Sequence, residues 1–104
     1  MKILDLSLKY IWYDMIERGE KTEEYREQKE YYYNRFFKSW IGGFVGVVFS
    51  GYKHYDAVRF HRGQGGKETM LFECKGITIG YGKPEWGAPE NRTVFIIRLG
   101  ERIK

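Results

Sequence analysis

Apolar positions in the first part of the chain recur at helical spacing, which predicts a helix of about three turns. Asp5-Leu6 begins a short entry segment, Ser7 is the expected N-cap, and Gly19 follows where a left-handed C-terminal cap is expected. The expected apolar stripe consists of Leu8, Ile11, Trp12, Met15 and Ile16.

The next two segments predict a short strand and a second helix. Residues Lys21 to Arg26 indicate a strand of mixed charge, and Glu27 to Trp40 indicate a helix that ends before Gly42-Gly43. The expected apolar side of this helix consists of Tyr33, Phe36, Phe37 and Trp40.

In the rest of the chain the spacing of apolar residues changes from helical to alternating, which predicts β-structure. The expected strands are Phe44 to Phe49, Asp56 to His61, Thr69 to Lys75 with a continuation through Ile79, and Val94 to Leu99. Tyr81 to Arg92 contains both prolines and indicates a loop. Short strands with glycine corners and two helices favour one α+β domain over residues 1–104, a small barrel closed by helices.

Composition narrows the classes of partner. The chain of 104 residues has 18 Lys and Arg against 14 Asp and Glu, a net charge of +4 that mildly favours anionic partners. One cysteine, Cys74, excludes an internal disulfide, and His54 and His61 stand without neighbouring ligands, so no metal or cofactor is expected. No segment resembles a secretion signal or a membrane span, which predicts a cytoplasmic protein without a membrane partner.

A charged cluster follows the first helix. Glu24 and Arg26 are two residues apart, so on a strand their side chains leave the same face, and Lys21 lies just before them. Such a cluster can grip a polar, partly anionic ligand. Equally, Glu24 and Arg26 can be an ion pair that ties the strand to the barrel mouth.

These residues fit the pattern Gly-x-Lys-x-x-Glu-x-Arg, which resembles the signature of the ASCH domain family, relatives of PUA-like barrels. Val48 to Tyr52, Trp86 to Pro89 and Phe95 to Ile103 add to the likeness with short bacterial and phage-type members. The resemblance implies a PUA-like β-barrel of about five or six strands, with two or three helices covering its ends. It also implies a cleft beside the motif that binds RNA or a modified nucleoside or nucleotide.

One branch of that family hydrolyses acyl groups from N4-acylated cytidine without a metal. The resemblance makes Lys21 the match to its catalytic lysine, but Glu24 stands where that branch has a catalytic threonine. A carboxylate cannot replace a hydroxyl nucleophile without a change of mechanism, and Thr22 lies two residues earlier. Glu73 is the candidate acid, so the alternative catalytic set is Lys21, Glu24 and Glu73.

The leading hypothesis assigns binding roles to seven residues: Lys21, Thr22, Glu24, Arg26, Arg35, Tyr52 and Trp86. Lys21 and Arg26 would face a phosphate or carbonyl, Glu24 would accept from a base amine, and Tyr52 or Trp86 would stack on the base. Trp86 can instead plug the barrel end.

Aromatic and basic residues interleave from Tyr31 to Trp40, where Arg35 is the best candidate for an exposed contact. A second alternative is a phage or mobile-element accessory protein that contacts another protein through an exposed aromatic patch from Tyr31 to Phe37.

Overall fold

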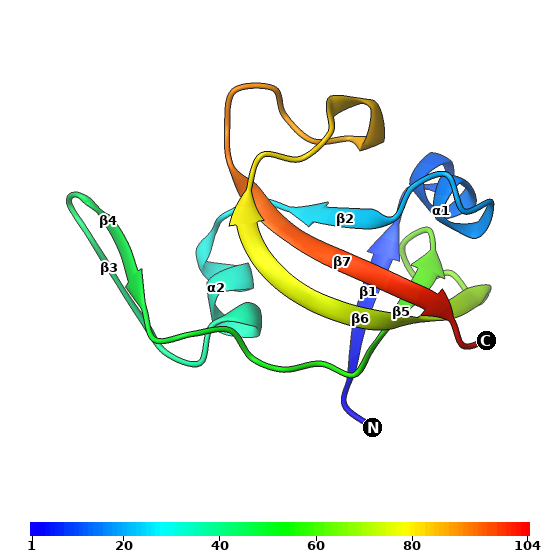
Figure 1. The fold of residues 1–104 in the computed structure, drawn as a ribbon, viewed down its shortest axis with the longest axis horizontal. Helices are drawn as coiled ribbons and strands as arrows, with labels where there is room; N and C mark the ends of the chain where they lie inside the picture. Colours follow the sequence, from blue (N-terminus) through cyan, green and yellow to red (C-terminus); the bar gives the residue numbers. More distant parts are fainter.

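A curled five-stranded sheet forms the centre of the molecule (Figure 1). The computed structural model describes residues 1–104. Across the sheet the strands are β1 (Ile3–Leu8), β5 (Ala57–Arg62), β6 (Thr69–Gly80), β7 (Val94–Arg102) and β2 (Glu23–Arg26). Strands β1 and β5 are parallel, and every other neighbouring pair is antiparallel. The sheet therefore forms a half-barrel with β1 and β2 as its two free edges, which confirms the α+β class.

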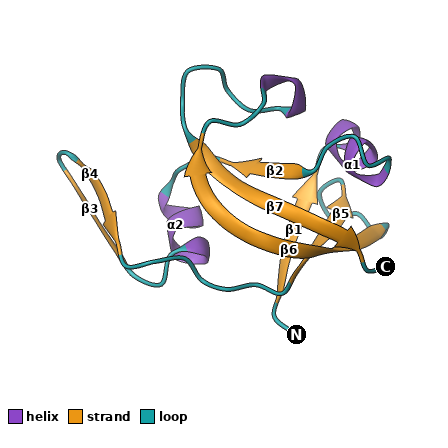
Figure 2. Cartoon of the chain, viewed as in Figure 1, coloured by secondary structure: helices purple, strands orange, loops and turns teal.

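Two helices and one hairpin complete the chain (Figure 2). Helix α1 (Tyr10–Glu17) joins β1 to β2, and helix α2 (Glu30–Phe36) follows β2. The hairpin of β3 (Trp40–Gly43) and β4 (Gly46–Phe49) is a separate two-stranded sheet, and a 3-10 turn, η1 (Pro84–Trp86), lies in the loop before β7. Neither helix has the length and apolar character needed to cross a lipid bilayer.

The hydrophobic core lies between the sheet and the helices. Side chains at alternate strand positions share a face, so each strand contributes every second residue. The core cluster consists of Leu4, Leu6, Leu8, Tyr13, Ile16, Phe36, Phe37, Val58, Phe60, Met70, Phe72, Ile77, Phe95 and Ile97.

The sequence prediction for the N-terminus was wrong. Residues 3–8 are strand β1 rather than an entry segment, and Lys9, not Ser7, precedes α1 as its N-cap. Leu8 therefore belongs to a strand, and Ile11 is exposed instead of lying on the buried stripe. The physical reason is pairing with β5, which aligns Leu4 with Val58 and Leu6 with Phe60 from the far half of the chain.

The second helix is also shorter than predicted, because it ends at Phe36 rather than near Trp40. The backbone after Phe36 is extended: Phe37 forms a β-bridge with Tyr52, and its ring stacks on Phe49 at 4.0 Å between centroids. Trp40 consequently starts β3. Burial of the Phe37 ring within this pairing outweighs continuation of the helical pattern.

Several local predictions are confirmed. Gly19 has a φ of +80°, its N–H donates to the Ile16 carbonyl, and the Glu20 N–H donates to the Met15 carbonyl, both at 3.0 Å. This pair of bonds is the Schellman arrangement that ends helices with glycine. The predicted strand from Thr69 through Ile79 is one strand, β6, with a register shift next to Gly76.

Candidate functional site

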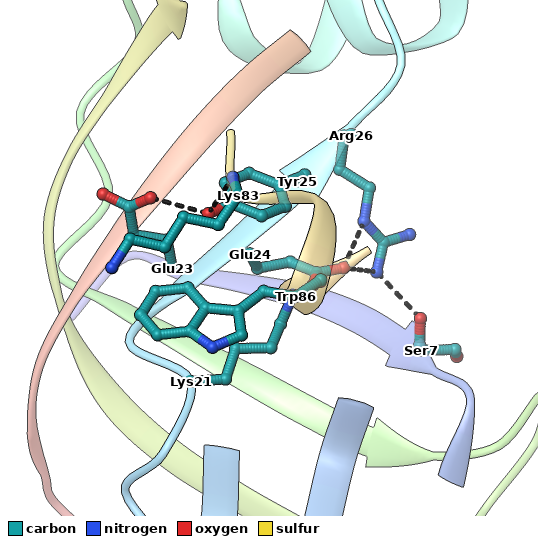
Figure 3. Close-up of polar contacts among 8 residues, drawn as sticks. All are labelled: Ser7, Lys21, Glu23, Glu24, Tyr25, Arg26, Lys83 and Trp86. Atoms are coloured by element: carbon teal, nitrogen blue, oxygen red, sulfur yellow. Dashed lines mark hydrogen bonds and ion pairs between the residues drawn. The ribbon is translucent and has the colours of Figure 1, made fainter. Parts of the chain in front are cut away.

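The three charged residues of the motif form one continuous chain of contacts (Figure 3). The Glu24 carboxylate lies between two cations: its Oε1 is 3.2 Å from Lys21 Nζ, and its Oε2 accepts from Arg26 Nε at 3.0 Å. Glu24 is 5% exposed and Lys21 only 2%. Burial in a low-dielectric surrounding makes each charge depend on its partner, so the cluster is a structural unit as well as a candidate site.

Arg26 connects the two free edges of the half-barrel. Its side chain leaves β2, and Nη2 donates to the Ser7 carbonyl of β1 at 2.8 Å while Nη1 donates to the Tyr32 hydroxyl at 2.9 Å. The guanidinium group thereby satisfies a carbonyl oxygen that lacks a strand partner on this side of β1. We call the region between these two edges the seam.

Lys21 is enclosed by the loop that carries Trp86. Its Nζ donates to the Trp86 carbonyl oxygen at 2.6 Å, and the rings of Trp12 and Tyr25 lie 5.1 Å and 4.7 Å from it. Burial lowers the pKa of the Lys21 ammonium below its ordinary value, and the charge of Glu24 opposes that shift. The Trp86 ring itself lies under the ammonium of Lys83, 4.2 Å away. Because the Trp86 carbonyl binds Lys21 and Lys21 is almost fully buried, this loop covers Lys21.

A cavity of about 320 Å³ opens at the seam next to the buried cluster. Its volume is at the lower end of the range for small-molecule pockets, about 300–1,000 Å³. The lining residues are Ser7, Leu8, Lys9, Trp12, Glu24, Tyr25, Arg26, Glu27, Lys29 and Tyr32. Three aromatic rings, three cations and two carboxylates therefore surround one hollow; we call it the seam cavity.

The structure brings together four of the residues proposed from the sequence. Lys21, Glu24 and Arg26 contact one another, and the Trp86 backbone joins them through its carbonyl. Only Glu24 and Arg26 line the seam cavity, because Lys21 lies beneath the Trp86 loop. The position of Trp86 therefore corresponds to a cover rather than to a wall of this cavity.

Arg35 and Tyr52 lie elsewhere. Arg35 Nη2 donates to the Asp5 carbonyl on the outer edge of β1 at 3.1 Å, and its own carbonyl accepts from the Tyr55 hydroxyl at 2.7 Å. Tyr52 packs beside Phe37 at the base of the hairpin and lines a different hollow. Arg35 thus has a structural contact of the same kind as Arg26, a guanidinium on a free β1 carbonyl.

The binding candidate Thr22 and the candidate acid Glu73 are also separate from the cluster. Thr22 is exposed, and its carbonyl accepts from the Leu99 N–H at 3.1 Å. Glu73 lies on β6, so β7 separates it from β2, and its Oε1 accepts from the Glu101 N–H at 2.9 Å. The structure assembles Lys21 with Glu24 but does not bring either Thr22 or Glu73 to them.

Sequence reasoning missed most of the cavity lining. Trp12 was assigned to a buried stripe, whereas its ring lies half-buried at the seam. Lys9, Lys29 and Tyr32 reach the cavity because the end of β1, β2 and the start of α2 all border it in the folded chain. The alternation of residues 3–8 is the one signal for a strand here, but the position of that strand and of Lys9 beside the motif is set by tertiary contacts.

No group of three or more His, Cys, Asp and Glu side chains is arranged to hold a metal ion. Comparison of the chain with family models, with curated proteins and with solved structures found no match.

Proposed function

We propose that this protein is an ASCH-type domain with a PUA-like fold that binds RNA or a modified nucleoside in the seam cavity. The seam cavity itself is the observation that carries the proposal. It combines aromatic faces, on which bases stack, with cations that can hold phosphate, and it lies beside the residues of the Gly-x-Lys-x-x-Glu-x-Arg motif.

The proposed roles differ in part from those expected for the motif alone. Glu24 already accepts from both Lys21 and Arg26, so Glu27, whose carboxylate has no side-chain partner, is the better acceptor for a base amine. Lys9 and Lys29 are exposed at the rim and are the better phosphate contacts. Lys21 then acts by holding Glu24 rather than by touching the ligand.

The test is a titration with short single-stranded RNAs over a salt series. Each phosphate contact contributes a slope of about −0.7 in log K against log salt. Replacing Lys9 and Lys29 together with alanine should therefore weaken binding and make the slope shallower by about 1.4. Lys67→Ala is the matched control, because Lys67 is an exposed lysine in the turn before β6 and remote from the cavity lining.

Trp12→Leu provides an independent readout of base stacking. Loss of one stacked base costs about 1–3 kcal/mol, and the salt slope should not change because no charge is removed. Absence of RNA binding at low salt in the unmodified protein, or equal binding by the Lys9, Lys29 double variant and the Lys67 control, would contradict the proposal.

One feature favours the hydrolase as a second candidate. Burial lowers the pKa of Lys21, so the unprotonated amine, which can act as a base, forms more easily. The burial of that amine beneath Trp86 weighs against it, since substrate can reach Lys21 only if the loop moves. Incubation with N4-acetylcytidine decides between the two. Release of cytidine that disappears in Lys21→Met would favour the hydrolase over a binding function alone.

A further inference from the structure

The β3–β4 hairpin extends away from the body of the molecule (Figure 1). Its strands pair in register from Trp40 opposite Phe49 to Gly43 opposite Gly46, so Phe44 and Val45 form the tip. One face is anchored: Trp40 and Val47 pack against the core, and the Trp40 indole N–H donates to Asn34 Oδ1 at 2.8 Å. The hairpin is therefore held at its base and free at its tip.

The free part of the hairpin is apolar. Phe44 and Val45 are fully exposed, and Ile41 and Val48, which lie directly opposite each other, are each 76% exposed. Phe49 adds a partly exposed ring nearer the base. Clustered apolar side chains of this kind on a protein surface usually mark an interaction site.

Charges surround the hairpin base but are absent from the hairpin itself. Residues 39–52 contain no charged side chain. Lys38 and Lys53 lie together at the base, because the Lys38 N–H donates to the Gly51 carbonyl and the Lys53 N–H donates to the Phe36 carbonyl. Residues 31–55 contain no Asp or Glu, so within this segment no carboxylate offsets the charges of Arg35, Lys38 and Lys53.

The order of side chains from tip to base follows the layers of a membrane surface. Aliphatic and phenyl groups form the tip, the rings of Trp40, Phe49 and Tyr52 come next, and lysines follow. Acyl chains, the interface and anionic headgroups favour these three classes in the same order. Four residues per strand give a length of about 13 Å, so an insertion of about 5–10 Å immerses the tip and leaves the lysines at the headgroups.

We propose that the β3–β4 hairpin inserts its tip into the surface of an anionic lipid bilayer. The inserted groups are Phe44, Val45, Ile41 and Val48, and the exposed Lys38 contacts the lipid phosphates. Lys53, whose ammonium donates to the Asn34 carbonyl at 2.7 Å, adds positive charge beside it. The insertion is shallow and does not span the bilayer, so it is compatible with the lack of a spanning helix. It departs from the expectation, drawn from the sequence, that the protein has no membrane partner.

The same features fit two other partners less well. A hairpin wedged into a nucleic-acid duplex needs cations along its arms to neutralise the phosphates beside the wedge, and these arms have none. A second copy of the chain docked through this hairpin would bring Lys38 and Lys53 of both copies together, and like charges across an interface oppose association. An anionic lipid surface offers acyl chains to the apolar tip and negative charge to the lysines at the base of the hairpin.

Co-sedimentation with vesicles tests the proposal without reference to RNA. Vesicles of equal parts phosphatidylcholine and phosphatidylserine should bind the protein, and vesicles of phosphatidylcholine alone should bind it less. Phe44→Ser combined with Val45→Ser should lower the partition coefficient about tenfold or more, because two apolar side chains are lost from the bilayer. Lys38→Gln should lower it about fivefold on the anionic vesicles and little on the neutral ones.

Ile11→Ser is the matched control, because it removes an exposed aliphatic side chain from α1, on a different element. It should sediment like the unmodified protein. Phe44→Trp gives a second readout: its emission should shift to shorter wavelength and be quenched by brominated lipids when anionic vesicles are added. All of the substituted side chains are exposed, so urea unfolding should show that all four variants remain folded.

Each remaining outcome overturns the proposal. No vesicle binding by the unmodified protein, or equal binding by the tip double variant, would exclude insertion of the tip. Loss of duplex binding in the tip variant without vesicle binding would assign the hairpin to nucleic acid. A concentration-dependent dimer that the tip variant abolishes, again without vesicle binding, would assign it to a second copy.

Discussion

Glu24→Gln is the sharpest test of the buried charge cluster. Glutamine preserves the shape of the side chain but removes its negative charge and replaces one acceptor oxygen with an NH₂ group. Lys21 Nζ faces Oε1 and Arg26 donates to Oε2, so a donor meets a donor on one side whichever way the amide is turned. Two cations then share a pocket without a counter-charge.

The magnitude follows from burial. Removing one partner of a buried ion pair costs about 3–5 kcal/mol, because the remaining charge stays out of water. Lys21 retains its bond to the Trp86 carbonyl and two aromatic neighbours, which places the expected loss near 3 kcal/mol at the lower end of that range. A small domain has a total free energy of unfolding of only about 5–15 kcal/mol, so the variant should fold but be much less stable.

Urea unfolding measures this directly. With an m value of about 1–3 kcal/mol/M, a loss of 3 kcal/mol lowers the midpoint by roughly 1–3 M. Glu20→Gln is the matched control: its pair with Arg18, at 3.2 Å, is more than half exposed on both sides, and such pairs contribute about 0–1 kcal/mol. If both variants unfold at the same urea concentration, the assignment of Glu24 as the charge that stabilises this cluster is refuted.

Two further predictions concern glycines and tyrosines. Gly19→Ala should cost about 1 kcal/mol through its backbone alone, because φ is +80° and no atom lies within 4 Å of the added Cβ. Gly87→Ala should cost more in the same urea assay, since φ is +102° and the new Cβ would lie 2.9 Å from the Trp12 ring; equal costs would contradict the packing of that loop. Alkaline stability should fall above pH 10, because unfolded tyrosines lose their protons there while buried ones keep them and the folded state then binds more protons. Absorbance of tyrosinate at 295 nm should show at least four of the nine tyrosines titrating late, and titration of all nine near pH 10 would exclude this. Burial raises the pKa of Tyr13, Tyr25, Tyr52 and Tyr55.

The sequence predicts structural elements correctly where the conformation of a segment depends on residues within that segment. The helix cap at Gly19 depends only on hydrogen bonds within the last turn. The strands that begin at Thr69 and Val94 are predicted by alternation and by β-branched residues. The charged motif could also be predicted, because Glu24 and Arg26 are two residues apart on a strand and Lys21 lies two residues before that strand begins.

Elements whose conformation depends on residues far away in the sequence could not be predicted from local patterns. The segment of residues 3–8 is short, and its strand exists through parallel pairing with residues 57–62. The helix predicted through Trp40 stops at Phe36 because Phe37 gains more by packing against Phe49 and Tyr52 than by extending the helix.

The sequence by itself determined the class of fold, the helix cap at Gly19 and the grouping of Lys21, Glu24 and Arg26, since all three follow from neighbours within a few residues. Only the tertiary structure decided what the group does. It buried Lys21 beneath Trp86, turned Arg26 toward the free edge of β1, and opened the seam cavity to other side chains. The physical reason is that a curled sheet has two free edges whose meeting is fixed by long-range pairing rather than by local pattern.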